Sequence, residues 1–242
     1  MKLEHSIFTS PGTRSVNEDF ADVVTAGSRR CYIVCDGLGG HGMGDKASRF
    51  VVGRLKEHFV SCSTNEEFAA SAIADAQTAL RQEQLRLGAV NMMKTTAVVL
   101  ATDGSSCICL HVGDSRLYHF RGGRVLFHTR DHSIPQMLVL MGDIREDEIR
   151  RHPDRNKLIR ALGDDKDEVK CEISRFEAGV GDAFLLCSDG FWEPIEDEQM
   201  CSLLEKTDSA PEWLRSMSRI CVENSRGRSM DNYTAIAVRV KE

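Results

Sequence analysis

The sequence predicts an α+β fold in which helices cover antiparallel β-sheets. One observation is a series of short runs rich in β-branched and aromatic residues, several of which follow each other with no helix between them. Another is the uneven placement of the helical segments, because two long ones precede most of these runs and one more precedes the last. A doubly wound parallel sheet would instead alternate strands and helices along the chain.

Seven runs have the composition of strands. They are residues 31–35, 95–102, 107–112, 117–120, 125–128, 183–187 and 233–240. The sequence RGGR at residues 121–124 separates two of these runs and is typical of a hairpin turn. Asp103 and Gly104 separate another two, and this dipeptide is expected to be an ordinary turn.

Three long helices are expected. The first covers residues 46–59, with an apolar face at helical spacing formed by Phe50, Val51, Leu55 and Phe59. The second begins at a capping box, TNEE at residues 64–67, and is closed by Gly88. The third has Pro211 in its first turn and ends near Gly227.

Length and charge limit the class of protein. A chain of 242 residues with 41% hydrophobic content can bury one core, so residues 1–242 are expected to form a single domain. The net charge of −6 argues against binding to nucleic acid or to an anionic membrane. Residues 1–10 lack the apolar core of a signal peptide, and no stretch approaches the roughly 18 apolar residues of a membrane span. We therefore expect a cytoplasmic protein.

The nine cysteines are expected to be reduced thiols, because no export signal accompanies them. The absence of any C-x-x-C pair excludes a zinc ribbon and a thioredoxin-type motif. No cysteine is followed six positions later by arginine, which excludes the phosphatases that use a cysteine nucleophile in a C-x5-R loop.

Four aspartates lie at the ends of strand-like runs, and they are the strongest functional signal in the chain. They are Asp36, Asp114, Asp189 and Asp231. A carboxylate beside glycine at a strand end leaves backbone carbonyls open and lets other oxygen atoms approach, as Mg²⁺ or Mn²⁺ requires. A single Asp-Gly is usually only a turn, but four acids at matching positions predict a cation site.

Six motifs in order along the chain resemble the metal-dependent protein serine/threonine phosphatases of the PP2C (PPM) family. They are GTRSVNED (12–19), VCDGLGGHGMGDKAS (34–48), HVGDSRLY (111–118), TRDHS (129–133), CSDG (187–190) and DNYTAIAV (231–238). They span nearly the whole chain, and DGLGGHG is similar to the bacterial branch. The resemblance implies a four-layer α-β-β-α sandwich, with two antiparallel sheets face to face, helices outside and a binuclear metal site at one edge.

The resemblance also implies ligands for Mn²⁺ or Mg²⁺. Asp36 corresponds to the carboxylate that bridges two ions, and the Gly37 carbonyl corresponds to a ligand of the second ion. Asp189 and Asp231 correspond to ligands of the first ion. Asp114, together with Asp189, corresponds to the place where bacterial members hold a third ion.

Three more residues take roles from the same resemblance. Glu18 and Asp19 match an acidic pair that binds the second ion directly or through water. Arg14 matches the arginine that grips phosphate, a task suited to its planar guanidinium. The implied reaction is hydrolysis of phospho-Ser/Thr monoesters by a water activated between two ions. The implied partners are phosphorylated proteins and a cognate serine/threonine kinase pathway, with secretion control among the roles of bacterial relatives, and we expect a monomer.

The chain departs from the family pattern at several points. Leu38 stands where other members have a histidine proposed to protonate the leaving group. His41 belongs to the bacterial GGHG pattern, and we interpret it as structural rather than as the acid. Lys94 replaces a usual glycine, which predicts a difference in the local backbone or in substrate access. The acidic, amphipathic segment 133–152 corresponds to the family's flap and is expected to govern substrate choice.

Other classes fit less well. Residues 39–46 faintly resemble a phosphate-binding P-loop, but Asp45 displaces the lysine and Ala47 follows where Ser or Thr is needed. The motifs G-x-S-x-G and H-E-x-x-H are absent, which argues against an α/β-hydrolase and a zincin. The remaining alternative is a catalytically inactive protein that keeps the PP2C fold as a binding scaffold. The presence of every expected metal carboxylate disfavours it.

Overall fold

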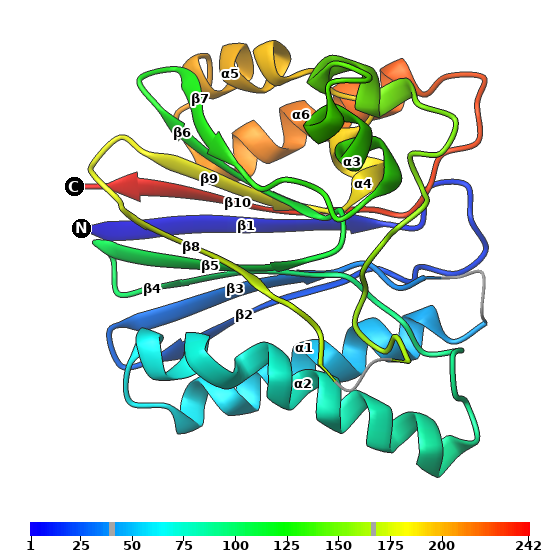
Figure 1. Cartoon of the computed structure of the whole chain (residues 1–242). Coiled ribbons are helices and arrows are strands. Elements are labelled where there is room, and N and C mark those ends of the chain that lie inside the picture. The colour runs from blue at the N-terminus through cyan, green and yellow to red at the C-terminus, as the bar shows by residue number, and fades with distance from the viewer. Residues whose placement is uncertain (39–41, 166–167) are drawn as a thin grey trace.

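The protein is a four-layer sandwich in which two five-stranded antiparallel sheets face each other and helices cover the outer faces (Figure 1). The computed structural model describes residues 1–38, 42–165 and 168–242. The predicted α+β fold with its α-β-β-α layers is confirmed.

Each sheet combines strands from distant parts of the chain. The first has the order β1 (Lys2–Ser10), β10 (Tyr233–Lys241), β9 (Ala183–Cys187), β6 (Arg116–Arg121) and β7 (Arg124–His128). The second has the order β2 (Phe20–Ala26), β3 (Arg29–Cys35), β4 (Ala97–Thr102), β5 (Ser106–Val112) and β8 (Glu172–Glu177). Pairing β1 with β10 along their full length brings the N-terminal segment beside the C-terminal strand.

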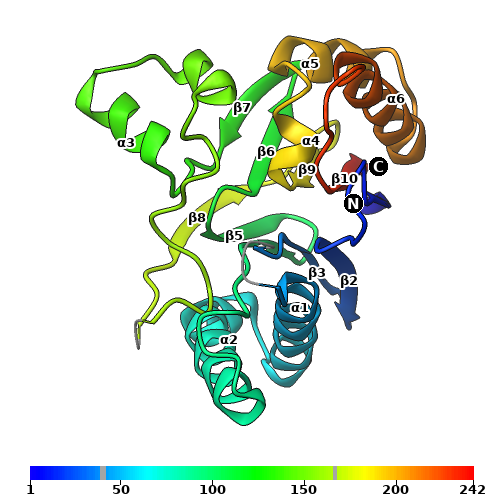
Figure 2. The same cartoon turned by 90° about the vertical axis from the view of Figure 1, so that its right-hand side faces the viewer.

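The helices divide between the two outer faces (Figures 1 and 2). The second sheet is covered by α1 (Gly44–Ser61) and α2 (Asn65–Leu87). The first is covered by α4 (Asp189–Trp192), α5 (Asp197–Glu205) and α6 (Ala210–Asn224). The helix α3 (Ile134–Met141) and the 3₁₀ helix η2 (Glu146–Arg151) form a separate lobe beside the first sheet, which Figure 2 shows most clearly.

All seven predicted strands are present, but three strands were not predicted. The missed strands are β1, β2 and β8, and each is at the edge of its sheet. An edge strand is partly exposed, so its sequence carries many polar residues; β1, with the sequence KLEHSIFTS, has no fully buried residue. The short-range composition signal is therefore weak where one side of the strand meets solvent.

The central strands are apolar throughout because both of their faces are covered. Tyr32 and Val34 of β3 point between the sheets, where they pack against residues such as Leu186 and Ile236. Ile33 and Cys35 of the same strand point to the other face, toward the core under α1 and α2. This alternation explains why β3, β4 and β9 lack the polar-apolar pattern of a half-exposed strand.

The local signals that end helices and turn hairpins are confirmed. Thr64 Oγ1 accepts a hydrogen bond from the Glu67 amide at 3.1 Å, and Gly88 closes α2 with a φ of 61°. Gly122 and Gly123 have φ values of 58° and 73°, as a tight hairpin turn between β6 and β7 requires. The third helix ends at Asn224, slightly before the expected position.

Candidate metal centre

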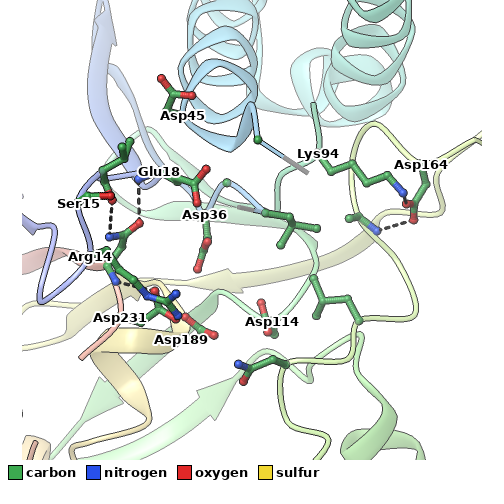
Figure 3. Close-up of a pocket in the computed structure, with 18 residues that line it drawn as sticks. Arg14, Ser15, Glu18, Asp36, Asp45, Lys94, Asp114, Asp164, Asp189 and Asp231 are labelled. Atoms are coloured by element: carbon green, nitrogen blue, oxygen red, sulfur yellow. Dashed lines mark hydrogen bonds and ion pairs between the residues drawn. The ribbon is translucent and has the colours of Figure 1, made fainter. Parts of the chain in front are cut away.

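A cavity of about 860 Å³ lies at one edge of the sandwich, where strand ends from both sheets meet. Its lining includes Arg14, Glu18, Asp36, Gly37, Asp114, Asp189 and Asp231. Figure 3 shows the four aspartates around a common centre, with Arg14 on one side and Lys94 on the other. Of the predicted site residues, only Asp19 is not in this lining.

The fold brings each aspartate to the cavity by a strand end. Asp36 follows β3 of the second sheet, and Asp189 begins α4 directly after β9 of the first sheet. Asp114 follows β5, whereas Asp231 precedes β10. Because β3 and β5 belong to one sheet and β9 and β10 to the other, the cavity exists only when the two sheets are stacked.

Gly37 is required by close packing. A Cβ atom at this position would lie 2.2 Å from the carbonyl oxygen of Gly44 and 2.7 Å from that of Glu18. The Gly37 amide donates to the same Glu18 carbonyl at 3.1 Å. The glycine therefore lets the loop after β3, the start of α1 and the segment before β2 meet beside Asp36.

The carboxylates of Asp36 and Asp189 share a hydrogen bond, and burial raises the pKa of both. The pKa of Asp189 rises to about 6, with Asp231 adding like-charge repulsion. Burial, followed by the charge of Asp189, also raises the pKa of Asp114 well above its usual range. The arrangement binds protons tightly without a cation, and it is an all-oxygen donor set of the kind that hard divalent ions prefer.

Asp19 lies behind the cavity rather than in its wall. Its side chain is buried, and Ser188 Oγ donates to its Oδ2 at 2.7 Å. Its Oδ1 has no hydrogen-bond partner in the described part of the chain. Burial raises the pKa of Asp19 to about 7. The acidic pair is thus split, because Glu18 lines the cavity while Asp19 is buried and does not line it.

Arg14 is at the rim and is largely exposed. Its Nη2 donates to Asp231 Oδ2 at 2.9 Å, and this contact raises the pKa of the guanidinium. The other oxygen, Asp231 Oδ1, accepts from the Asn232 amide at 2.8 Å. The arginine predicted to hold phosphate therefore touches a predicted metal ligand.

Asn232 belongs to the motif DNYTAIAV, from which no role for its side chain is predicted. Its side-chain amide donates to the carbonyl oxygens of Pro11 and Val16, both at 3.0 Å, and its Oδ1 accepts from the Glu18 amide at 2.8 Å. These contacts hold the loop that carries Arg14 and Glu18 against the start of β10. Only the tertiary structure reveals this role, because the partners are more than 200 residues away in sequence.

The departures from the family pattern lie in the opposite wall. Leu38 lines the cavity, and His41 lies outside the described residues. Lys94 also lines it, and its Nζ is 2.9 Å from Asp164 Oδ1. Other described residues of the lining come from 156–164, and none of them comes from the predicted flap, 133–152.

The predicted flap, 133–152, is expected to be acidic and amphipathic. The structure shows instead that it begins with an apolar helix, α3. Ser133 caps α3, which has the sequence IPQMLVLM, and Gly142 ends it. Leu140 and Met141 are exposed on this helix. The acidic residues gather later, in η2.

A second group of potential ligands, His111, His132 and Glu172, lies outside the cavity. The Gly113 amide donates to His132 Nδ1 at 3.0 Å. His132 Nε2 is 3.2 Å from Glu172 Oε1 and 3.0 Å from Arg160 Nη1, so both ring nitrogens of His132 have polar partners within the protein.

All nine cysteines are free, as predicted. None is among the described residues that line the cavity. Burial raises the pKa of every one of these thiols, including those of Cys35 and Cys187 at the strand ends nearest the site. A cysteine nucleophile is therefore excluded on the structure as well as on the sequence.

The sequence profile described as Protein phosphatase 2C matches residues 12–232. The chain belongs to the protein phosphatase 2C family. It is 33% identical over 234 residues to serine/threonine protein phosphatase PstP of Mycobacterium tuberculosis, an alignment that covers 94% of this chain and 43% of PstP. It is 32% identical over 238 residues to the serine/threonine phosphatase Stp of Listeria welshimeri, covering 93% and 90% of the two chains.

Solved structures of phosphatases have the same fold. Serine/threonine phosphatase Stp1 from Staphylococcus aureus superposes with a TM-score of 0.91 at 28% identity, covering 100% of this chain and 96% of the other. PppA, described as a key regulatory component of the T6SS in Pseudomonas aeruginosa, gives 0.81 at 32% identity, with 99% and 98% coverage. The catalytic domain of PstP in complex with two manganese ions gives 0.82 at 27% identity, with 99% of both chains covered.

The 2C-family assignment agrees with the residues gathered in the cavity. Its relatives are named serine/threonine phosphatases, and one of them was solved with manganese. In the described part of the chain, no helix has the length and apolarity needed to cross a membrane.

The metal-free protein should become more stable as the pH falls from about 7.5 to 5.5. The folded-state pKa values of Asp189, about 6, and Asp19, about 7, exceed the ordinary value of 3.8, so the folded state binds more protons than the unfolded state in this window. The gain should be on the order of 3 kcal/mol. Urea unfolding in EDTA at several pH values measures it.

With saturating Mn²⁺ the trend should reverse, because protons then compete with the cation for the same oxygens. Asp19→Asn provides a control, since it removes one of the two titrating groups. A free energy of unfolding in EDTA that falls as the pH is lowered would contradict the electrostatic description of the site.

Proposed function

We propose that the chain is a protein serine/threonine phosphatase that hydrolyses phospho-Ser/Thr monoesters with two Mn²⁺ or Mg²⁺ ions, and that residues 1–242 act as one catalytic domain. The observation that carries the proposal is the convergence of Asp36, Asp189 and Asp231 from two sheets in one cavity with Arg14 at its rim. Family membership and the names of the relatives support the same reaction.

The residues present fit a pair of hard cations. The donor set is all oxygen, Gly37 leaves room for its own carbonyl beside Asp36, and Asp19 Oδ1 is a buried acceptor that lacks a partner among the described residues. Asp36 would bridge the two ions, Asp189 and Asp231 would hold the first, and Gly37 and Glu18 the second. Asp19 would accept from water on the second ion, and Asp114 with Asp189 would hold a third.

Two such ions, when bound, would neutralise charge on the phosphate and lower the pKa of a water molecule. The protein supplies rigid positions for the ligands. Asp36 and Asp189 are fixed by strand ends and by their mutual hydrogen bond, so little reorganisation is needed when a cation replaces the shared proton.

Arg14 would orient the substrate. Without a cation its guanidinium pairs with Asp231, at 2.9 Å. A cation held by Asp231 would compete for that carboxylate. The Arg14 side chain, which is 56% exposed, would then be free to donate to two phosphate oxygens. The positive charge of Arg14 would thus have two roles. Without metal it reduces the repulsion among the carboxylates, and with metal bound it would hold the substrate phosphate.

The proposed substrates are phosphorylated proteins, and the proposed context is a pathway with a bacterial serine/threonine kinase. The similarity to PppA, described as a regulatory component of the T6SS, makes secretion control one role to examine. We place the protein in the cytoplasm, consistent with its nine free cysteines, and as a monomer. An inactive scaffold would be favoured if a metal-binding carboxylate were missing, but all the predicted carboxylates are present.

The purified protein should hydrolyse p-nitrophenyl phosphate and phospho-Ser/Thr peptides only with added Mn²⁺ or Mg²⁺. Oxygen ligands bind these ions weakly enough for a chelator to remove them. Initial rates before and after EDTA treatment, and after Mn²⁺ is restored, measure the dependence. Full activity in excess EDTA would contradict the metal mechanism, and inactivity with every metal would favour the scaffold.

Asp36→Asn and Asp189→Asn should each abolish turnover without unfolding the protein. The amide keeps the volume of the side chain but loses the charge that holds the cation, and it also removes like-charge repulsion from the metal-free site. Turnover and thermal melting in EDTA test both statements. Asp103→Asn is the matched control, because it makes the same change at a surface Asp-Gly turn. Near wild-type turnover in either site variant would show that the ligand is misassigned.

Arg14→Ala should lower kcat/KM by roughly ten- to a hundredfold, which corresponds to about 1.5–3 kcal/mol for a charge-assisted bidentate contact. The loss should fall mainly on KM if the arginine grips ground state and transition state alike. Mn²⁺ affinity should not decrease, since the variant frees Asp231. Arg124→Ala, at an exposed turn, is the control. Unchanged kcat/KM for a phosphopeptide and an aryl phosphate would make Arg14 an ordinary surface charge.

A further inference from the structure

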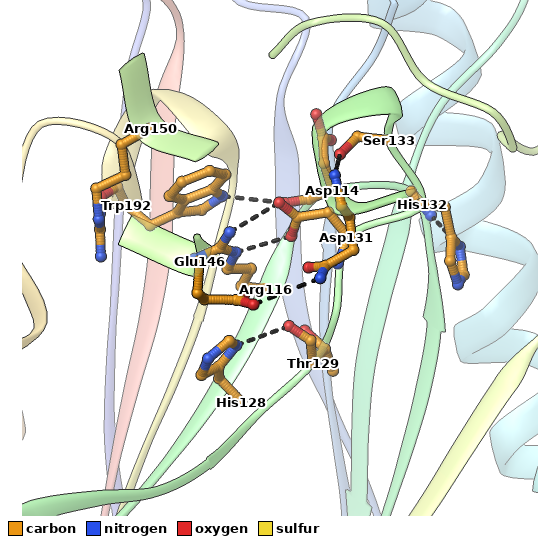
Figure 4. A network of polar contacts seen from close by, with 12 residues as sticks. Asp114, Arg116, His128, Thr129, Asp131, His132, Ser133, Glu146, Arg150 and Trp192 are labelled. Carbon is orange, nitrogen blue, oxygen red and sulfur yellow. Dashed lines mark hydrogen bonds and ion pairs between the residues drawn. The ribbon is translucent and has the colours of Figure 1, made fainter. Parts of the chain in front are cut away.

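A buried ion pair between Arg116 and Asp131 lies close to Asp114 but outside the cavity lining, and it takes no part in the reaction described above (Figure 4). Arg116, at the start of β6, donates through Nε and Nη2 to both carboxylate oxygens of Asp131, each at 2.7 Å. Its Nη1 donates to the Tyr118 hydroxyl at 3.0 Å. Both members of the pair are less than 5% exposed, so their charges are removed from water and compensate each other.

The flat face of Arg116 packs on Trp192. The guanidinium carbon is 3.5 Å from the centre of the indole ring, and Arg150 approaches the same side chain at 5.3 Å. The Arg150 guanidinium also donates to the Trp192 carbonyl. The indole is thereby held in one orientation by stacked cations, in a site that is 2% exposed.

Trp192 in turn touches the metal centre at two points. Its Nε1 donates to the carbonyl oxygen of Asp114 at 3.0 Å. It is also the last residue of α4, a single turn that begins with Asp189. The position of the indole therefore fixes the backbone of Asp114 relative to the turn that carries Asp189.

The fixed distance between Asp114 and Asp189 opposes the repulsion between their carboxylates. Asp114 and Asp189 repel each other, and the other charges that act on Asp114 most strongly, Asp131 and Glu193, are carboxylates too. Two carboxylates that must share one ion will separate unless their backbones are held. The hydrogen bond from Trp192 supplies that restraint, and the Arg116–Asp131 pair maintains the geometry of the donor.

We propose that Trp192, set in place by Arg116 and Asp131, is a positioning residue for the ion shared by Asp114 and Asp189. The inference rests on the proposed phosphatase function only in taking these carboxylates as metal ligands. None of the three residues touches the cavity, so their effect is exerted through the backbone of Asp114 and through α4.

The flap is connected to the same network. The Asp131 amide donates to Gln136 Oε1 of α3 at 3.3 Å, and Gln136 Nε2 is 3.5 Å from Glu146 of η2. Arg150, which grips Trp192, is also in η2. A change in the lobe formed by α3 and η2 would therefore reach the metal ligands through Trp192.

The test is direct Mn²⁺ binding to five purified proteins, the wild type and four variants, with the free ion measured by electron paramagnetic resonance. Trp192→Phe keeps an aromatic ring against Arg116 and removes the hydrogen bond to Asp114. Trp213→Phe is the matched control, because Trp213 is also buried and donates to a carbonyl, that of Met200, at 3.1 Å, away from the site. Asp114→Asn defines which binding step belongs to Asp114.

Trp192→Phe should weaken the Mn²⁺ step that Asp114→Asn removes by about tenfold, the lower range for loss of a group that orients a ligand. Trp213→Phe should lower the melting temperature about as much as Trp192→Phe does, because each variant loses one buried hydrogen bond. It should leave all Mn²⁺ binding steps unchanged. Arg116→Lys, which keeps the charge but loses the fork and the flat face, should shift the same step as Trp192→Phe.

Equal Mn²⁺ binding by Trp192→Phe and Trp213→Phe would overturn the inference and leave Trp192 a structural residue. Identical binding by the wild type and Asp114→Asn would also overturn it, because no ion would then depend on Asp114. Neither result requires enzyme activity. Failure of the phosphatase proposal, seen as inactivity with every metal, is therefore distinguishable from failure of the positioning role.

Discussion

The apolar contact between the two sheets is the interaction on which the cavity depends. Leu100 and Val34 of one sheet pack with Leu186 and Val238 of the other, and this packing fixes how the sheet edges align. The strand ends that carry Asp36 and Asp189 belong to different sheets. Their carboxylates meet only because the two sheets are packed together through this apolar contact.

That rigidity is needed because the site is electrostatically unfavourable without a cation. Burial and like charges raise the pKa of Asp36, Asp114 and Asp189, and the shared hydrogen bond between Asp36 and Asp189 is a partial remedy. The ion pair between Arg14 and Asp231 at the rim also reduces the repulsion. The carboxylates are held close by packing, glycines and backbone hydrogen bonds, and a divalent ion would relieve the repulsion that the fold maintains.

The same principle explains why so much buried polar structure surrounds the cavity. Asn232 fixes the loop that carries Arg14 and Glu18, and Trp192 fixes the backbone of Asp114. Arg116 belongs to the motif HVGDSRLY and Asp131 to TRDHS. Neither residue lines the cavity, and the two pair with each other outside it. A motif residue can therefore be essential to the geometry of a site without contacting anything that reacts.

The sequence by itself determined the central strands, the three long helices with their caps, and the set of acids at strand ends, since these depend on local composition and on short-range capping. The edge strands β1, β2 and β8 were not predicted from the sequence because their exposed sides carry polar residues. Only the tertiary structure decided that Glu18 lines the cavity while Asp19 is buried and does not line it, that Arg14 pairs with Asp231, and that Arg116 grips Asp131 outside the cavity lining. Those outcomes depend on contacts between segments far apart in the chain, where orientation is set by the packing of the two sheets and leaves no local signal in the sequence.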